Sequence, residues 1–256
     1  MNQRLSVFII TRNAENKLED CLNALRWVDE VVIVDSASTD RTIELANRFG
    51  SKIYSHAFQD FADQKNYAMQ LCGGEWLLSI DSDEVVTDEQ RKEIQKIIKT
   101  PNPCVAYRIP RRSVIFGREF HFSGTQDDCP IRLLKNGCGT FVNPIHESLI
   151  IQGRVGELKA PMMHFTYDSL ADYFQRFNCY TTLESEFLLK KAHTVHFADF
   201  FLRPIAMFIK LWILKQGFRD GWEGFVFCLF SAWYVFVKYA KYRELLRCRA
   251  PLCRRL

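Results

Sequence analysis

Short apolar runs alternate with helix-like segments through the first hundred residues. The runs Leu5–Ile10 and Glu30–Val34 are rich in branched apolar residues, as strands covered on both faces are. Between them, apolar residues recur with the spacing of one helix face, at Leu18, Cys21, Leu22 and Leu25. Asn13 stands where a residue would cap this helix.

The same alternation continues to about residue 100. We expect further strands at Lys52–Ser55 and Glu75–Ile80, and helices at Thr39–Phe49, at Asp63–Leu71 and after Thr87, which forms a capping box with Gln90. A strand–helix order of this kind predicts an α/β fold in which helices flank both faces of a mostly parallel sheet.

The pattern changes between residue 101 and about residue 167. Short strands separated by glycine and proline turns are expected there, at Val105–Ile109, Ile131–Leu134 and Leu149–Ile151. Asp168 is then expected to cap a long amphipathic helix that ends near Ala192. Its buried face is predicted to hold Leu170, Phe174, Phe177, Leu183 and Phe187.

Composition and charge separate the C-terminal end from the rest. The chain is 48% hydrophobic and 25% charged, which excludes a disordered protein. Its net charge is +4, but the segment from Lys238 onward carries +6, so the preceding residues carry −2. Of 35 aromatic residues, 13 lie within Phe197–Phe236. A globally basic nucleic-acid binder is therefore not expected, and an aromatic, then basic, C-terminal segment has to be explained.

The cysteines and the N-terminus indicate a reducing compartment. Nine cysteines are present, and none form a C-x-x-C pair. We therefore expect neither a zinc site nor a disulfide framework, and we expect Cys21 and Cys72 to be small buried apolar residues. The N-terminus has no basic segment followed by a long apolar one, so no cleaved signal peptide is expected and the main body should be cytoplasmic.

Polar clusters follow three of the predicted strands. They are Thr11-Arg12-Asn13, the segment Asp35–Asp40, and Asp81-Ser82-Asp83. Ligands bind beyond the carboxyl ends of strands in open parallel sheets, so these clusters should face one crevice. The glycine fingerprint of dinucleotide binding and the lysine motif of nucleotide triphosphatases are both absent, which argues against NAD, flavin or a P-loop.

The Asp81-Ser82-Asp83 cluster has the D-x-D form. Two carboxylates placed two residues apart at a strand end can face one Mg²⁺ or Mn²⁺ ion, which in turn can hold a diphosphate and neutralise a leaving group. The next residue, Glu84, is expected to be solvated at the entry to a helix.

Several stretches resemble a known family at this point. SVFIITRNAENKLEDCL, VDEVVIVDSASTDRTIELA and FADQKNYAMQLCGGEWLLSIDSDE resemble the start of family-2 glycosyltransferases, whose GT-A fold is Rossmann-like. PIRLLKNG, FVNPIHESL and APMMHFTYDSLADYFQRFNCY resemble the branch that holds lipopolysaccharide-core β-1,4-glucosyltransferases, which add glucose to an inner-core heptose. The resemblance covers roughly residues 5–190.

The resemblance implies a donor site for a nucleotide sugar. Thr11 and Asn13 would lie in the first nucleotide loop, and Asp35 would accept the base N–H of uracil. Asp40 would brace that loop, and Lys65 would lie near the diphosphate. For Asp40 a helix cap, and for Lys65 an exposed helix residue, are the alternatives.

The resemblance also implies a metal site and a phosphate contact. Asp81 would approach the ribose or the metal, Asp83 would ligate the metal, and His164 would complete the metal shell. Arg132 would meet phosphate or only flank a strand. In the apolar run MMHFTY, a buried histidine without a ligand is the alternative for His164.

The acceptor base is expected at His146-Glu147, where most GT-A members have Glu-Asp. We choose Glu147 as the base, with His146 as a partner or a core histidine, and keep Asp127 and Asp128 as the runner-up pair. The resemblance then implies an inverting single displacement: Glu147 deprotonates the acceptor hydroxyl, and the metal and Lys65 stabilise the departing diphosphate.

The C-terminal segment is expected to lie on the membrane. The longest uncharged run, Gly224–Val237, has 14 residues, whereas a spanning helix needs about 20. Together with Phe197–Leu214, this run predicts two amphipathic or re-entrant helices in the bilayer interface, and the cations that follow them would meet anionic lipid. A helical hairpin that packs on the catalytic body or on a partner chain is the alternative. The expected organisation is a GT-A domain over residues 1–195, with a nucleotide half (1–100) and an acceptor half (101–195), followed by membrane-associating helices over 196–256.

Together these features predict that the protein lies at the cytoplasmic face of a bacterial inner membrane. Its expected partners are a UDP-hexose, a lipid-anchored glycan and anionic lipid, with no nucleic acid. Three alternatives stay open. They are an acceptor that is a polyprenyl-linked sugar, a catalytically silent membrane scaffold of the same fold, and a nucleotidyltransferase, which would normally have a glycine-rich loop where this chain has TRNAEN.

Overall fold

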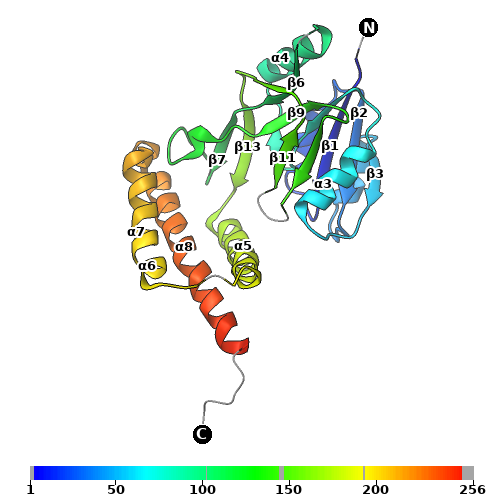
Figure 1. Cartoon of the computed structure of the whole chain (residues 1–256). Helices are drawn as coiled ribbons and strands as arrows, with labels where there is room; N and C mark the ends of the chain where they lie inside the picture. Colours follow the sequence, from blue (N-terminus) through cyan, green and yellow to red (C-terminus); the bar gives the residue numbers. More distant parts are fainter. Residues whose placement is uncertain (1–2, 102, 144–146, 193, 250–256) are drawn as a thin grey trace. The chain divides into compact units, whose positions relative to one another are not determined.

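The computed structural model describes residues 3–101, 103–143, 147–192 and 194–249, and Figure 1 labels its elements. The chain packs into two compact units. Residues 1–112 and 127–165 form the first, and residues 113–126 and 166–256 form the second. The boundaries of these packing units differ from the expected boundary between a catalytic domain and membrane-associating helices at residue 195. That functional division stays a prediction.

A seven-stranded sheet is the centre of the first unit, in the order β12-β6-β9-β4-β1-β2-β3. The central strands β4, β1, β2 and β3 run parallel, β9 is antiparallel to β4 and β6, and β12 is parallel to β6. The strand bounds are β1 Leu5–Thr11, β2 Glu30–Asp35, β3 Lys52–Ser55, β4 Trp76–Ser79, β6 Cys104–Arg108, β9 Ile131–Lys135 and β12 Arg154–Glu157. The mostly parallel α/β sheet expected from the sequence is confirmed.

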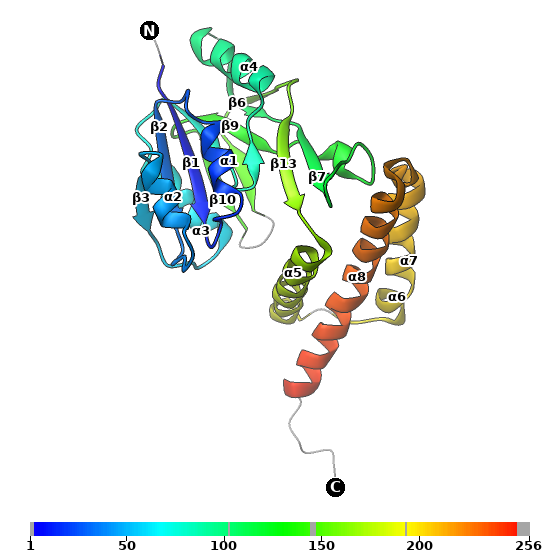
Figure 2. The same cartoon turned by 180° about the vertical axis from the view of Figure 1, so that it is seen from behind.

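Helices cover both faces of this sheet. Helices α1 (Leu18–Asn23), α2 (Thr42–Arg48) and α4 (Asp88–Lys99) bury their apolar residues in one cluster, and α3 (Phe61–Gln70) buries its own in a second. Figure 2 shows α1 and α2 on the face opposite to α3. Because successive side chains of a strand point to opposite faces, alternate residues of β1 enter the two clusters.

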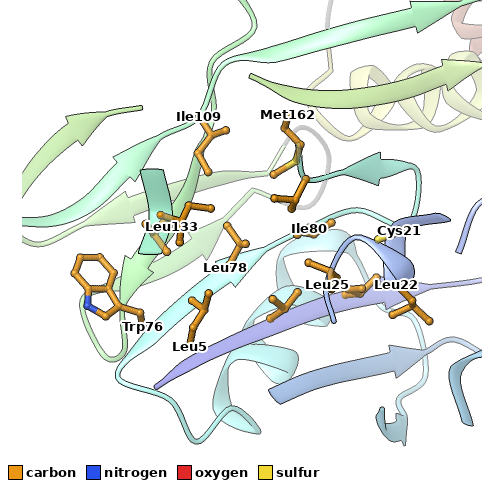
Figure 3. Packing of buried hydrophobic residues seen from close by; sticks show 14 of the residues in the cluster. Leu5, Cys21, Leu22, Leu25, Trp76, Leu78, Ile80, Ile109, Leu133 and Met162 are labelled. Carbon is orange, nitrogen blue, oxygen red and sulfur yellow. The ribbon is translucent and has the colours of Figure 1, made fainter. Parts of the chain in front are cut away.

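The larger cluster holds the first unit together. Leu5 of β1 and Trp76 and Leu78 of β4 lie in it, below Leu133 and Met162 (Figure 3). All five are at most 1% exposed. At about 25 cal/mol per Å² of buried apolar surface, such side chains stabilise the sheet by roughly 1.5–3 kcal/mol each.

Further strands extend the first unit. The hairpin of β10 (Gly139–Val142) and β11 (Ser148–Ile151) contributes Phe141 to the second cluster. The short strand β5 (Glu84–Val85) pairs with the start of β13 (Met162–Tyr167), so that His164 lies opposite Glu84 in the ladder.

Helices dominate the second unit. They are α5 (Leu170–Lys190), α6 (Phe197–Phe200), α7 (Leu202–Ile209), the π-helical turn η2 (Lys210–Leu214), the 3-10 turn η3 (Gly217–Asp220) and α8 (Gly221–Arg249). The unit also contains the 3-10 turn η1 (Thr125–Asp127) up to Gln126, strand β8 (Arg118–Glu119) and the end of β7 (Arg111–Ile115), which pairs with β8. Both α5 and α7 pack along α8, α5 through Phe177 and Tyr234 at 5.5 Å between ring centroids and α7 through Phe208 and Phe225 at 6.0 Å.

A buried aspartate fixes the start of α8. The two oxygens of the Asp220 carboxylate accept hydrogen bonds from the backbone N–H groups of His121 and Phe122, and one also accepts from the hydroxyl of Ser123. Asp220 is 2% exposed, so these bonds replace the water that it loses on folding.

Three local predictions are wrong. Asn13 does not cap α1, because its backbone is left-handed (φ 51°) and α1 begins later, after Lys17. Ser169, not Asp168, caps α5 by accepting from the N–H of Asp172. The buried face of α5 is rotated, so that Tyr173, Phe177, Thr181 and Ser185 are inside while Leu170 and Phe174 are exposed.

The C-terminal helix is longer than its uncharged run suggested. By length and composition alone, one helix in the described part of the chain, Gly217–Cys248, is apolar enough to cross a membrane. The uncharged run Gly224–Val237 is only the middle of that helix, which continues through the polar and charged residues on both sides of the run. The helix is therefore longer than the run, and the expectation that this segment is too short to span a membrane is wrong.

The buried carboxylate of Glu30 makes a prediction about acid stability. Burial raises its pKa, but hydrogen bonds from Lys52, Ser6 and Gly73 outweigh this and lower the pKa to about 2. Because the unfolded pKa is 4.5, the stabilisation is complete above pH 4.5 and is lost as the pH falls toward 2.

We therefore expect Glu30→Gln to lower the free energy of unfolding by about 3 kcal/mol at pH 7, and by progressively less below pH 4.5. Urea unfolding at pH 7, 4 and 3 measures this, with exposed Glu89→Gln as the control. A loss that is the same at all three pH values would contradict the assignment.

Candidate active site

The carboxyl ends of β1 and β2 form one wall of the site. Thr11 and Asp35 lie opposite each other in the ladder, and the Thr11 hydroxyl donates to the Asp35 carboxylate at 3.0 Å. Asp35 also accepts from the backbone N–H and the hydroxyl of Ser38. Asp35 is 4% exposed, and its Oδ2 accepts one hydrogen bond, from the N–H of Ser38, so this oxygen keeps a lone pair for another donor.

The loops after β1 and β2 are tied together. The side-chain oxygen of Asn13 accepts from the N–H of Thr39 at 2.8 Å, and the N–H of Asn13 donates to the Ser38 hydroxyl. Asp40 accepts from Thr42 and from the N–H of Glu15. Although burial raises the pKa of Asp40, these hydrogen bonds lower it below its usual value, so the brace is anionic.

Lys65 connects two acids from distant parts of the chain. It lies on α3, is 3% exposed, and its ammonium group is 3.0 Å from Asp81 and 2.6 Å from Glu147. Two hydrogen bonds between the Asn66 side-chain amide and the backbone of Phe141 connect α3 to the β10–β11 hairpin beside Glu147. The exposed-helix alternative for Lys65 is therefore wrong.

Arg132 holds the other side of Asp81. Its guanidinium lies 2.5 Å from both Asp81 and Glu84. Glu84 is fully buried and also accepts from the N–H of Asp81, which closes the D-x-D turn. The expectation that Glu84 is solvated is wrong: β5 pairing turns its side chain inward, toward the two arginines that neutralise it.

A second arginine completes the network. Arg111 lies 2.8 Å from Glu84 and donates to both carboxylate oxygens of Asp128 at 2.9 Å. Acids and cations therefore alternate in one continuous series of ion pairs, which runs from Asp128 to Glu147 through Arg111, Glu84, Arg132, Asp81 and Lys65. Neither Arg111 nor Glu84 was predicted to belong to the site.

The network keeps Asp81 ionised. Burial raises its pKa, but the positive charges of Arg132 and Lys65 hold it well below the usual range. Both oxygens of Asp81 face cations, so this carboxylate orients polar groups and is poorly placed to ligate a metal ion.

Asp83 and His164 are the pair that fits a metal. A carboxylate oxygen of Asp83 lies 3.6 Å from a ring nitrogen of His164, and β5–β13 pairing brings them together. A carboxylate with an imidazole is a donor set that Mn²⁺ accepts. Within the described residues, no group of three or more His, Cys, Asp or Glu side chains is arranged to hold a metal ion.

The two base candidates differ in their surroundings. Glu147 has one oxygen paired with Lys65 and is partly exposed, whereas both oxygens of Asp128 accept from Arg111. His146 lies outside the described residues, and Asp127 lies in η1. A carboxylate that takes up a proton needs a free oxygen, which favours Glu147 over Asp128.

Glu84 and Arg111 leave only a weak trace in the sequence. Glu84 directly follows the D-x-D motif, and Arg111 lies in a basic pair that any exposed strand could carry. What identifies them is the pairing of strands that are far apart in the chain, and a single sequence does not reveal this pairing.

Comparison with known proteins gives a consistent result. Residues 6–153, more than half of the chain, match the sequence model of glycosyl transferase family 2. The chain is 29% identical to an uncharacterised glycosyltransferase of Rickettsia typhi, over 95% of this chain and 88% of that protein. It is 27% identical to the lipopolysaccharide core biosynthesis glycosyltransferase LpsC of Rhizobium meliloti, over 93% and 91%.

A solved structure is also similar. The Staphylococcus aureus TarS fragment 1–349, crystallised with UDP-GlcNAc, matches 96% of this chain and 92% of its own, with 14% identity and a TM-score of 0.48.

The buried arginine gives a testable consequence. Arg132→Met takes from Asp81 the nearer of the two cations beside its Oδ2 and leaves buried Glu84 with Arg111 as its remaining partner, and we expect the free energy of unfolding to fall by about 3–5 kcal/mol. The control is Arg91→Met, which removes a surface pair with Asp88 and should cost less than about 1 kcal/mol. Urea denaturation followed by circular dichroism measures both, and equal stabilities of the two variants would contradict the network.

Proposed function

Because the chain belongs to glycosyl transferase family 2, we propose that it moves a hexose, glucose from UDP-glucose being the first candidate, to an inner-core heptose of lipopolysaccharide. The likeness to LpsC over most of both chains supports an envelope glycan as the acceptor class. The arrangement of Lys65 between Asp81 and Glu147 carries the proposal, because it places a D-x-D acid and a candidate base around one cation.

The donor would bind along the ends of β1, β2 and β4. Asp35 would accept the uracil N–H with its remaining lone pair, and the loop held by Thr11 and Asn13 would line the ribose. Lys65 would meet the diphosphate. Arg132 would act through Asp81, which it keeps ionised and oriented toward the sugar or ribose hydroxyls.

Asp83 and His164 would hold a divalent cation, which when bound neutralises the negative charge that develops on the leaving diphosphate. Lys65 would act on the same diphosphate and favour the departure of UDP. The ion pair with Asp81 keeps the Lys65 ammonium at one place in the crevice, which reduces the reorganisation needed at the moment of reaction.

Glu147 would act as the general base. The diphosphate competes with Glu147 for Lys65, so donor binding would release a carboxylate oxygen toward the acceptor hydroxyl. That oxygen takes the hydroxyl proton as the hydroxyl attacks the anomeric carbon, the bond to the diphosphate breaks, and the configuration inverts. This describes a single displacement without a covalent enzyme intermediate.

The acceptor would be presented at the cytoplasmic face of the inner membrane. A sugar on a lipid anchor cannot diffuse to a distant enzyme, so an enzyme that acts on it has to reach the bilayer surface. The long apolar helix Gly217–Cys248 and the aromatic segment before it support such a location.

The proposal is tested by incubating the purified protein, with Mg²⁺ or Mn²⁺, with a panel of UDP-sugars and with lipid A–core acceptors truncated at each inner-core sugar. We expect one donor to label only acceptors that end at a heptose. Transfer to polyprenyl-linked acceptors alone, or no UDP release with any pair, would contradict it.

The base assignment gives a matched pair of variants. Glu147→Gln should lower turnover by roughly 10²–10⁴-fold, because it removes general base help, while binding of UDP is kept. Asp128→Asn should lower turnover far less, because both oxygens of Asp128 already serve Arg111. Steady-state UDP release measures both effects, and the reverse order of the two losses would move the base to Asp128.

A further inference from the structure

Most of the exposed large apolar side chains lie in the second unit, between the start of α6 and the middle of α8. Of the 17 large apolar side chains that are exposed among the described residues, 11 lie between Phe197 and Trp233. Four of them follow one another at helical spacing along α7 and η2, and each is 43–63% exposed: Leu202, Ile205, Ile209 and Ile213. We call these four residues the α7 face.

The opposite side of α7 is already packed. Phe208 and Trp212 contact Phe225 of α8 edge to face, with ring centroids 6.0 and 5.5 Å apart, and Phe200 of α6 contacts Phe236 at 6.1 Å. The α7 face therefore points away from α8. Exposed aromatic residues extend the apolar surface beyond it, at Phe197, Phe201, Phe218, Trp222 and Trp233.

Cations outnumber acids along the α7 face. The segment 200–219 contains Arg203, Lys210, Lys215 and Arg219 and no acid, and Arg203 is paired with buried Asp199 at 2.8 Å, so that Lys210, Lys215 and Arg219 carry the other positive charges. Long cationic side chains can lay their stems on an apolar surface and place their charges at the level of lipid headgroups. An apolar stripe with such a border fits the surface of an anionic bilayer better than it fits a neutral protein partner.

Packing against α5 argues that α8 does not cross the bilayer. Lys238 pairs with Glu184 at 2.9 Å, and the hydroxyl of Tyr234 donates to the same carboxylate at 2.8 Å. Lys241 donates to Asn178 and Thr181 of α5. If α8 crossed the membrane, these contacts would carry α5, with its many charged and polar residues, into the hydrocarbon as well.

These contacts also change the expected role of the basic end. The ammonium groups of Lys238 and Lys241 are taken up by α5, so they do not face lipid. Among the residues of α8 whose side chains are described, Arg243 and Arg247 are exposed, and Arg243 also lies over the ring of Phe200. Lys210, Lys215 and Arg219 lie in the segment of the apolar residues and are the larger group.

From these observations we infer that the protein is monotopic. The α7 face lies in one leaflet of an anionic bilayer, α7 and α8 run along the membrane plane, and α8 does not cross. This inference rests on the proposed function only for the claim that the acceptor is on a membrane. It adds the surface that binds and the topology of binding.

Two substitutions of the same residue type test the surface. Ile205 on the α7 face and Ile150 on β11 are both 57% exposed. Full-length protein is sedimented with vesicles of phosphatidylethanolamine and phosphatidylglycerol, without any sugar substrate. We expect Ile205→Glu to weaken vesicle binding by about tenfold or more, and Ile150→Glu to leave it within about twofold.

Equal binding of the wild type and both variants would overturn the inference. So would a wild-type dimer that forms without vesicles and is lost in Ile205→Glu, because the face would then bind a second copy of the chain. This assay contains no donor or acceptor, so it tests the membrane surface by itself. A protein that binds these vesicles but transfers no sugar in the panel of UDP-sugars and acceptors would refute the proposed function and leave this inference standing.

Cysteine labelling tests the topology. Cys179 on α5 and Cys248 near the end of α8 are both exposed. In sealed inner-membrane vesicles with the cytoplasmic face outward, a membrane-impermeant maleimide should label both cysteines, as mapped on peptides. If either is protected until detergent is added, α8 does not lie on one side and the monotopic arrangement is wrong.

Discussion

The ionised carboxylate of Asp81 is the point on which the first unit's chemistry depends. An anion that is partly withdrawn from water is costly unless cations pair with it, and here Lys65 and Arg132 approach Asp81 from two sides. Each cation then brings in another acid, Lys65 bringing Glu147 and Arg132 bringing Glu84. Strand ends, a helix and a hairpin that lie far apart in the sequence are held at one place by this single electrostatic requirement.

The same requirement divides the acids into two kinds. Asp128, Glu84 and Asp81 have their oxygens directed at cations, which fixes the geometry and leaves them little capacity for further ligands. Asp83 and Glu147 stand at the border of the network, with His164 and Lys65 as neighbours, and these are the two acids that we propose as metal ligand and base. The division follows from pairing, since all five residues have the same functional group.

The sequence predicts most of the first unit because its strands are continuous apolar runs and its helices have a clear periodicity. The predicted strand Lys52–Ser55 coincides with β3, and Thr87 caps α4 as expected. Prediction is poorer where tertiary contacts decide. Asn13 looks like a helix cap but links two loops, and Glu84 looks solvated until β13 pairs with β5 and arginines from β7 and β9 surround it.

The second unit shows the same limit in its charges. Counting residues suggests a basic tail that binds lipid, yet Lys238 and Lys241 are needed to pack α8 on α5. The length of an uncharged run likewise says little about a helix that charged residues continue on both sides. In both units the partners that residues meet in the fold, more than their kind, decide which charges remain for binding.

The central claim is that Lys65, placed by Asp81 and Glu147, meets the diphosphate of a nucleotide sugar. Calorimetric titration of UDP and of uridine into the wild type, Lys65→Met and the exposed-helix control Lys92→Met tests it most directly. The expected result is a loss of about tenfold or more in UDP affinity for Lys65→Met alone, with uridine affinity unchanged, because uridine has no phosphate. Unchanged UDP affinity in Lys65→Met, or an equal loss for uridine, would contradict the claim.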